Sequence, residues 1–394
     1  MEAPAITTIQ GSKDDLVDLA SIERELARMW RSVSERGKVA ITRACRSNLV
    51  VLAEGESPEF VEEVTVRHPA RLIAVLRSVA ADGEGSPPIR AQVSALCHLR
   101  EAGGFVCSER IALTVKEGAE NRVASVVSGL AVGGLPIAVI GQPAAVERYA
   151  GAGLLELADR ILVDTTGAAP NVWTRLLGPA ALERRLTDLA WTRLAEFRRA
   201  VARAIVRSPM RRAVDRLEAV DIAHARGFTP ALLLAAWLGH RLRWGRPRRR
   251  RLMDGPVAAG AAEDLRVFEV RARGRRLRLR LGEAREPEGL VLLLRAPEIE
   301  LRVALAAEES VVTVALGAGR VRLRSGGRPG IRRGGSRAQE RVELKIPQPA
   351  DLIVQALEHP GLCDVDASPV LARAMELAAE LSKDKEDRDR DLDL

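Results

Sequence analysis

Residues 48–76 read NLVVLAEGESPEFVEEVTVRHPARLIAVL, and this stretch decides the fold class. Its two ends, Asn48 to Ala53 and Arg71 to Leu76, are compact apolar runs rich in branched residues, which is typical of buried strands. The segment between them, Pro58 to Arg67, has the apolar spacing of a helix. The order strand, helix, strand predicts two neighbouring parallel strands joined by a helical connection.

The flanking sequence extends this unit into a larger domain. Asp18 to Arg36 carries apolar residues at helical spacing and predicts an amphipathic helix packed on a sheet. Ile89 to Leu99 and Phe105 to Val115 are longer strand candidates, and the glycine pair between them indicates an inserted hairpin. Helices and strands then alternate through residues 120–164, so we expect residues 1–207 to form an α/β domain with a mostly parallel or mixed sheet.

A different kind of sequence follows Ser208-Pro209, where proline cannot continue the helical hydrogen bonds. Arg276 to Leu281 alternates strictly between arginine and leucine, which predicts a strand with one buried and one cationic face. Helices from Thr229 and from Ala350 accompany several such strands. We therefore expect residues 208–381 to form an α+β domain with an antiparallel sheet, and the charged tail, residues 382–394, to be disordered.

Composition places the chain among globular proteins with aliphatic cores. Its 47% apolar content is ordinary for such proteins, and 394 residues are enough for two or three domains. The sequence has neither a run long enough for a membrane helix nor a signal pattern, so we expect a cytoplasmic protein without membrane contact. The four cysteines are widely spaced and are expected to be reduced: Cys45, Cys97, Cys107 and Cys363.

The motifs of common enzymes and cofactor sites are absent from the sequence. It has no phosphate loop, no dinucleotide-binding glycine pattern and no histidine pair at metal-ligand spacing, so we expect no cofactor, no metal and no catalytic residue. Two weaker possibilities remain open. Asp159 and Asp164 could meet at the carboxyl edge of a parallel sheet, and Cys107 could approach His98 across the hairpin.

The positive charge is concentrated in the second half of the chain. Between Arg241 and Lys345 basic residues outnumber acidic ones by two to one, whereas the whole chain carries a net charge of only +8. The alternating strand would present Arg276, Arg278 and Arg280 on one face. Such a face could be solvated, could meet an acidic protein surface or could contact nucleic acid, and the scarcity of interleaved aromatic residues disfavours nucleic acid.

One short segment combines an acid, an indole and a base. Asp188, Trp191 and Arg193 fall within seven residues that read DLAWTRL. The structural interpretation has Trp191 packed under the sheet, Asp188 capping a helix and Arg193 pairing locally. The functional alternative places Trp191 and Arg193 at a partner interface, where tryptophan and arginine are enriched.

Several short motifs occur along the chain in an order and spacing that resemble those of a known protein family. They are Ile22-Glu23-Arg24-Glu25-Leu26 through Trp30, Asn48-Leu49-Val50-Val51, His68-Pro69-Ala70-Arg71, Cys107-Ser108-Glu109-Arg110-Ile111, Leu135-Pro136, Leu157 to Asp164, Asp188 to Leu194 and Ala231 to Trp244. Together they resemble the glucose-6-phosphate dehydrogenase assembly proteins, the OpcA family. The resemblance implies a non-catalytic protein that binds glucose-6-phosphate dehydrogenase and favours its active oligomer, which supports the oxidative pentose phosphate pathway.

The expected function is therefore that of an assembly factor or activator rather than an enzyme. The first alternative is a nucleic-acid-binding protein that uses the arginine run from Arg246 to Arg251 and the arginine face of the predicted sheet. The second is an α/β enzyme built on Asp159 and Asp164. The sequence does not determine the oligomeric state or the surface that meets the partner.

Overall fold

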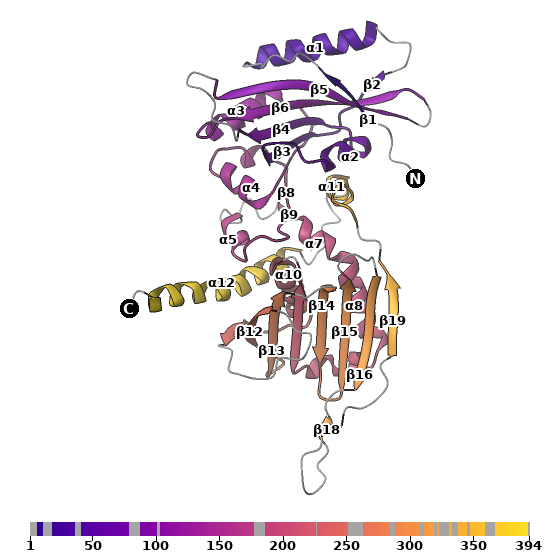
Figure 1. The fold of residues 1–394 in the computed structure, drawn as a ribbon, viewed down its shortest axis with the longest axis vertical. Coiled ribbons are helices and arrows are strands. Elements are labelled where there is room, and N and C mark those ends of the chain that lie inside the picture. The colour runs from indigo at the N-terminus through magenta and orange to yellow at the C-terminus, as the bar shows by residue number, and fades with distance from the viewer. Residues whose placement is uncertain are drawn as a thin grey trace. The chain divides into compact units, whose positions relative to one another are not determined.

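The computed structural model divides the chain into two compact units, which are described one at a time below. Unit 1 comprises Met1–Asp164, Leu176–Leu189 and Pro347–Cys363, and unit 2 comprises Thr165–Arg175, Ala190–Ile346 and Asp364–Leu394. The structure describes residues 6–10, 18–35, 41–78, 87–100, 103–176, 186–225, 227–250, 263–283, 288–306, 311–318, 321–322, 331–332, 338–344, 347–358 and 367–392. Figure 1 shows the elements of both units in sequence colours.

A nine-stranded sheet forms the centre of unit 1. The strand order is β1 (Ile6–Gln10), β5 (Ile89–Leu99), β6 (Phe105–Val115), β4 (Arg71–Arg77), β3 (Asn48–Glu54), β7 (Ile137–Gly141), β8 (Arg160–Val163) and β9 (Leu186–Asp188), with β2 (Ile41–Arg43) paired to β6. The pairings from β6 through β9 are parallel, and those of β1 with β5 and β5 with β6 are antiparallel. The expected mostly parallel sheet with an inserted hairpin is confirmed.

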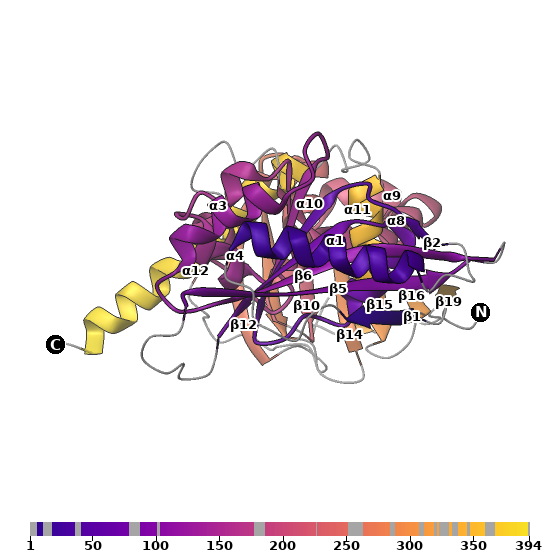
Figure 2. The same ribbon diagram turned by 90° about the horizontal axis from the view of Figure 1, so that it is seen from above.

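The two faces of this sheet are covered by different helices. The helices of unit 1 are α1 (Leu19–Glu35), α2 (Phe60–Arg67), α3 (Glu120–Leu130), α4 (Pro143–Tyr149), the short η1 (Leu155–Leu157) and α11 (Pro349–Glu358). Helix α1 packs along β5, as Figure 2 shows from above. Helices α2 and α11 pack together over the other face, where Leu72, Leu96 and Ile353 belong to one apolar core. Because both faces are covered, β3 and β4 are buried almost throughout, which explains their continuous apolar runs.

Sequence patterns did not indicate three of these strands. β1, β2 and β9 are five residues long or shorter and lie at or near the margins of the sheet. Strands this short carry too few residues for a period-two pattern to stand out. β9 ends at Asp188, the residue expected to cap a helix, and the helical part that follows is divided into α7 (Leu189–Arg193) and α8 (Ala195–Arg207).

Unit 2 contains an eight-stranded sheet. The strand order is β11 (Arg248–Arg250), β12 (Glu263–Ala272), β13 (Arg275–Glu283), β10 (Ala219–His224), β14 (Glu288–Arg295), β15 (Ile299–Ala306), β16 (Val311–Ala318) and β19 (Ala338–Glu343), and β17 (Val321–Arg322) pairs separately with β18 (Ile331–Arg332). All neighbours in the large sheet are antiparallel except β10 and β13. The expected antiparallel sheet is confirmed, with this one parallel pair.

Helices cover one face of the second sheet. They include α8, α9 (Met210–Ala213) and α10 (Thr229–Arg241). A further helix, α12 (Ala367–Leu392), packs on α10. Two other helices are short: α5 (Val172–Leu176) and η2 (Val214–Arg216). α10 is buried from Thr229 to Gly239. Its contacts with β10 and β13 lie over the leucine side of β13, where Leu277, Leu279 and Leu281 are at most 1% exposed. The alternation of β13 therefore separates a leucine face from an arginine face, as its sequence predicts.

Two segments differ from their sequence-based description. The Ser208-Pro209 break ends α8 as expected but lies inside unit 2, so that α8 belongs with the second sheet. α12 continues as a helix to Leu392, where we expected a disordered tail, while residues 393–394 are outside the described part. The tail places Asp384 four residues before Arg388 and Glu386 four before Arg390. An acidic residue four positions before a basic one is a sequence pattern that favours helix formation.

A strained helix end in unit 2 gives a stability prediction. Arg243, just after α10, has a φ of 54°, and Trp244 N donates a hydrogen bond to Gly239 O at 2.8 Å. Glycine adopts this left-handed conformation at lower cost than arginine. We expect Arg243→Gly to raise the free energy of unfolding by about 1 kcal/mol in urea titrations. Arg241→Gly, within the helix, should instead lower it by about 1 kcal/mol, and a loss in both variants would contradict the argument.

Candidate functional site

The family-like motifs converge on a buried ion pair in unit 1. Arg71 begins β4, and Glu109 lies beside it on β6. The Arg71 guanidinium donates from Nε to Glu109 Oε2 at 2.7 Å, and its second terminal nitrogen lies 2.7 Å from the same oxygen. The two side chains are only 7% and 4% exposed. Charges this deep require several partners, because desolvation is costly.

Other donors and acceptors of the Arg71–Glu109 pair also have hydrogen-bond or ion-pair partners. The Trp30 indole of α1 donates to Glu109 Oε1 at 2.7 Å, and the Arg43 guanidinium lies 2.7 Å from that oxygen. Arg71 further donates to Glu23 Oε1 at 2.9 Å and to the Leu130 carbonyl at 2.7 Å. The cluster ties α1 and the end of α3 to the sheet. Since every charge is already neutralised by a neighbour, it serves to hold the fold rather than to react.

A second motif residue fixes the loop after α3. The Asn48 side chain donates to the Val132 and Leu135 carbonyls at 3.1 and 3.2 Å, and it accepts from Val132 N at 2.7 Å. The residue is fully buried at the start of β3. Its role is to satisfy the backbone of this loop.

A serine, a histidine and a carboxylate of unit 1 are arranged in the order of a hydrolase triad. Ser47 Oγ and His68 Nε2 are 2.9 Å apart, and His68 Nδ1 is 3.8 Å from Glu358 Oε1. Ser47 and His68 are 3% and 5% exposed. Burial, with a smaller contribution from Arg46, lowers the pKa of His68. Because the distance from His68 Nδ1 to Glu358 is longer than a hydrogen bond and Nδ1 has no other hydrogen-bond partner among the described residues, the carboxylate does not orient the imidazole, and we assign the group a structural role.

The hairpin contains a disulfide where we expected reduced thiols. Cys97 and Cys107 face each other on β5 and β6, with an S–S distance of 2.03 Å and a Cα–Cα distance of 4.1 Å. The expectation of free thiols was wrong here because spacing along the chain does not show that two residues meet across a hairpin. The possible Cys107–His98 pair is also wrong, since His98 follows Cys97 directly and points to the opposite face.

The disulfide gives a second stability prediction. Closing a loop of this length removes conformational entropy from the unfolded chain, so the double variant Cys97→Ser with Cys107→Ser should lose about 2–3 kcal/mol of unfolding free energy. Dithiothreitol should reduce the stability of the unsubstituted chain by a similar amount in urea titrations. The double variant should not respond to the reductant. If dithiothreitol lowered the stability of the double variant, or left that of the unsubstituted chain unchanged, the presence of the disulfide would be contradicted.

The other cysteines offer no reactive thiol in the described residues. Cys45 is free and half-buried, and its sulfur accepts a hydrogen bond from Arg71 N at 3.2 Å. Burial raises the pKa of the Cys45 thiol, which disfavours the nucleophilic thiolate. Cys363 lies outside the described residues.

Trp191 lies in the interior. It is 4% exposed, and the Arg198 guanidinium stacks over its ring at 3.3 Å from the centroid while donating to the Trp191 carbonyl at 2.6 Å. Arg193 donates to Thr166 Oγ1 at 2.7 Å. Asp188 ends β9 and directly precedes α7, which is the position of a helix cap. The packing interpretation of Trp191 fits the structure, and a buried indole presents no surface to a partner.

The arginine face of unit 2 consists of Arg276, Arg278 and Arg280 on β13. Arg276 and Arg278 are exposed. Arg280 is different, because it forms two hydrogen bonds with Asp221 of β10, at 2.6 and 2.7 Å. Asp221 also pairs with Arg295, which reaches Glu300 at 2.9 Å. The face thus has a fixed, charge-paired centre, and two exposed cations lie beside it, of which Arg276 is 3.7 Å from Glu269 Oε1 of β12. In the arginine run from Arg246 to Arg251, Arg248–Arg250 form edge strand β11, while Arg251 is outside the described residues.

The two aspartates of the alternative enzyme site are separated by a strand. Asp159 precedes β8 and accepts a hydrogen bond from Ile137 N at 2.8 Å, whereas Asp164 follows the other end of β8. They therefore lie at opposite edges of the sheet, and the expectation that both occupy its carboxyl edge was wrong. Within the described ranges, no group of three or more potential metal ligands is close enough to bind an ion.

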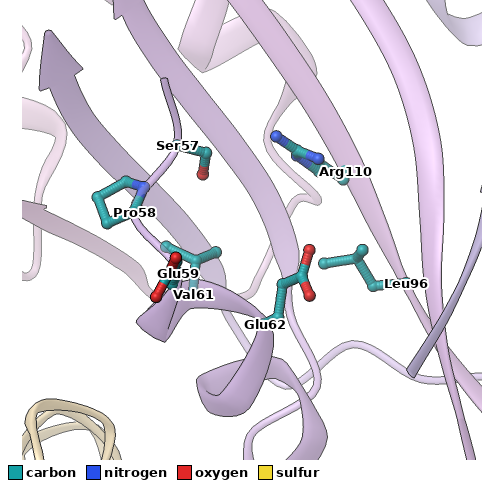
Figure 3. Close-up of a pocket in the computed structure, with 7 residues that line it drawn as sticks. All are labelled: Ser57, Pro58, Glu59, Val61, Glu62, Leu96 and Arg110. Carbon is teal, nitrogen blue, oxygen red and sulfur yellow. The ribbon is translucent and has the colours of Figure 1, made fainter. Parts of the chain in front are cut away.

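A small cavity in unit 1 brings together polar residues that sequence reasoning did not single out as a site. It measures about 170 Å³ and is lined by Ser57, Pro58, Glu59, Val61, Glu62, Leu96 and Arg110. Figure 3 shows side chains from the loop after β3, from α2 and from the hairpin around one hollow. Arg110 occurs in a family-like motif, and one signal was available: it is the charged residue on a face of β6 that otherwise alternates through Val106, Ser108, Ala112 and Thr114.

Helices of the described part of the chain are all too short or too polar to cross a membrane.

Comparison with protein families identifies two consecutive matches. Residues 61–178 match the N-terminal domain of the glucose-6-phosphate dehydrogenase subunit, and residues 184–374 match the C-terminal domain of the same family of proteins. Two curated relatives, from Nostoc punctiforme and Synechocystis sp., are both named as OxPP cycle protein OpcA. Each is 29% identical over 48% of this chain, and the alignments cover 41% and 40% of those proteins, so this chain spans about two fifths of their length.

Similar solved structures include a biliverdin reductase from Synechocystis, with 11% identity and a TM-score of 0.43, covering 85% of this chain and 98% of that one. Another is an oxidoreductase from Bacillus subtilis, with 8% identity and a TM-score of 0.45, covering 86% of this chain and 98% of that one. Likeness at this level supports no argument about activity. The paired domain matches, the OpcA relatives and the order of the motifs agree, and the chain belongs to the glucose-6-phosphate dehydrogenase assembly (OpcA) family.

Proposed function

We propose that this chain is a non-catalytic assembly factor that binds glucose-6-phosphate dehydrogenase and favours its active oligomer in the cytoplasm. The observation that carries the proposal is the pair of family matches, which name a subunit of that dehydrogenase and follow one another along the chain. The cluster around Arg71 and Glu109 supports it as well, because its buried charges are paired with one another in the described residues.

An assembly factor acts by binding one state of its partner more tightly than another. A preference of about 1.4 kcal/mol shifts the ratio of the two states tenfold. The chain therefore needs a surface that recognises the assembled dehydrogenase, and it needs no chemistry of its own. Activation would appear as a change in the dehydrogenase, while the isolated chain turns over no substrate.

The arginine face of unit 2 is the surface we propose for this contact. Arg276 and Arg278 stand beside the paired group of Asp221 and Arg280, which holds the centre of the face in one conformation. An acidic patch on the dehydrogenase would complement the two exposed cations and accelerate association. Trp191, being buried, is left out of the interface, and Arg193 is committed to Thr166.

Mixing the purified chain with the dehydrogenase of the same cell tests the proposal. Mass photometry should show a complex at micromolar concentration, and the dehydrogenase should gain activity together with its larger oligomer. Absence of a complex at that concentration would refute the function. Binding of DNA or RNA that weakens steeply with salt, without binding of the dehydrogenase, would favour the nucleic-acid alternative.

Charge reversal on β13 tests the surface separately. The double variant Arg276→Glu with Arg278→Glu should weaken the complex at least about tenfold at low salt, because two attractions become repulsions. Arg203→Glu is the matched control, since Arg203 is an exposed arginine of α8, on the helix side of the same sheet. Equal loss in both variants, or no loss in either, would show that binding does not use this face.

A further inference from the structure

Four polar side chains of unit 1 line one cavity without a protein partner. Ser57, Glu59, Glu62 and Arg110 surround the hollow of about 170 Å³ (Figure 3). Among the residues that the structure describes, the side chains of these four form no hydrogen bond or ion pair. Nearby arginines behave differently, because Arg71, Arg77 and Arg67 each pair with a carboxylate.

Arg110 is the most unusual member of this cavity. It follows Glu109 on β6, so the two side chains point to opposite faces of the sheet. Glu109 is saturated on the α1 side, whereas Arg110 is on the α2 side and is partly buried. Its Nε is buried and has no hydrogen-bond partner in the described structure. A buried donor of this kind is costly unless a water molecule or a ligand accepts its hydrogen bond.

Two acidic side chains also line the cavity. Glu59 precedes α2 and Glu62 lies in its first turn, so both carboxylates come from the same short segment as Ser57. In Figure 3 the Glu62 carboxylate lies on the same side of the cavity as Arg110. Neither carboxylate is within ion-pair distance of that guanidinium. The cavity therefore keeps a cation and two anions apart, with space between them.

The floor of the cavity is apolar and the space is small. Val61 and Leu96 are 1% and 2% exposed, and Pro58 closes one side. The volume corresponds to about six water molecules at liquid density. This is enough for a small metabolite and too little for a nucleotide.

We infer that this cavity binds a small α-amino acid as its zwitterion. The ligand carboxylate would accept hydrogen bonds from the Arg110 guanidinium, and its ammonium group would donate to Glu62 and Glu59. Its side chain would rest on Val61 and Leu96 or reach Ser57. A simple anion such as phosphate would be repelled by two carboxylates, and a simple cation would leave the Arg110 donor unused.

Isothermal titration of the full chain with L-alanine and L-serine tests the inference. We expect saturable binding at millimolar concentration or tighter. Alanine methyl ester lacks the carboxylate and N-acetylalanine lacks the ammonium group, so each should bind at least about tenfold more weakly. Inorganic phosphate should not compete. Absence of binding, or equal binding of either blocked analogue, would overturn the inference.

Substitutions locate the binding. Arg110→Met and Glu62→Gln should each weaken alanine binding about tenfold or more. Glu63→Gln, the next residue of α2, and Arg122→Met, an exposed arginine of α3, should leave binding unchanged. Glu62 is exposed, so its variant carries the test even if Arg110→Met does not fold. Unchanged binding in Glu62→Gln would refute this site. The measurement uses no dehydrogenase, so its failure is separate from any failure of the proposed function.

Discussion

Glu109→Ala is expected to lower the free energy of unfolding by about 3–5 kcal/mol, the loss typical of breaking a buried ion pair. The substitution removes the acceptor for Arg71 and for the Trp30 indole, and it leaves the Arg71 charge in the interior. Urea unfolding followed by circular dichroism measures the change. Glu117→Ala is the control: its carboxylate is 82% exposed beside Arg77, so it should cost less than about 1 kcal/mol.

A double variant separates lost attraction from stranded charge. Combining Glu109→Leu with Arg71→Met replaces the pair with apolar side chains and leaves no buried arginine at this position in the sheet. It should be more stable than Glu109→Ala, because most of the cost in the single variant is an unpaired buried charge. If the double variant were the less stable of the two, the pair itself would be the stabilising element.

Trp191→Ala is expected to cost about 3–5 kcal/mol, the range found when a large aromatic residue is removed from a core. The substitution leaves a cavity and removes the surface on which Arg198 stacks. Thermal and urea unfolding measure the loss, and Val206→Ala, at a side chain 60% exposed, should change stability by less than about 0.5 kcal/mol.

The same variant distinguishes the two interpretations of Trp191. A residue that mainly contacts a partner would leave the stability of the isolated chain unchanged and weaken the complex. The milder Trp191→Phe keeps an aromatic ring for Arg198, so it should retain both the fold and dehydrogenase binding. If Trp191→Phe folded stably but no longer bound the dehydrogenase, Trp191 would be assigned to the partner interface.

The strongest sequence patterns were reliable because each reflects local geometry. The hairpin strands Ile89–Leu99 and Phe105–Val115 occur as predicted, since the glycines at 103 and 104 adopt the positive φ that a tight reversal needs. The alternation of β13 likewise shows which face is buried. Both depend on residues close together in the chain.

Predictions that depended on strand pairing, on strand ends or on distant residues were less successful. The Cys97–Cys107 bond depends on hairpin register, and the separation of Asp159 from Asp164 depends on where β8 begins and ends. α11 packs beside α2 although nearly three hundred residues separate them in the chain. A single sequence does not encode such pairings in any local pattern.

By itself, the sequence determined the alternating α/β character of the first half, the two-faced strands of the second and the family to which the chain belongs. These follow from periodicity and motif order, which are properties of neighbouring residues. Only the tertiary structure decided which polar groups are satisfied. Glu109 and Arg110 are adjacent residues of one strand, but their surroundings differ. Glu109 is enclosed by hydrogen-bond and ion-pair partners, whereas Arg110 faces an open cavity. The physical reason is that a strand sends successive side chains to opposite faces, and what packs on each face comes from elsewhere in the chain.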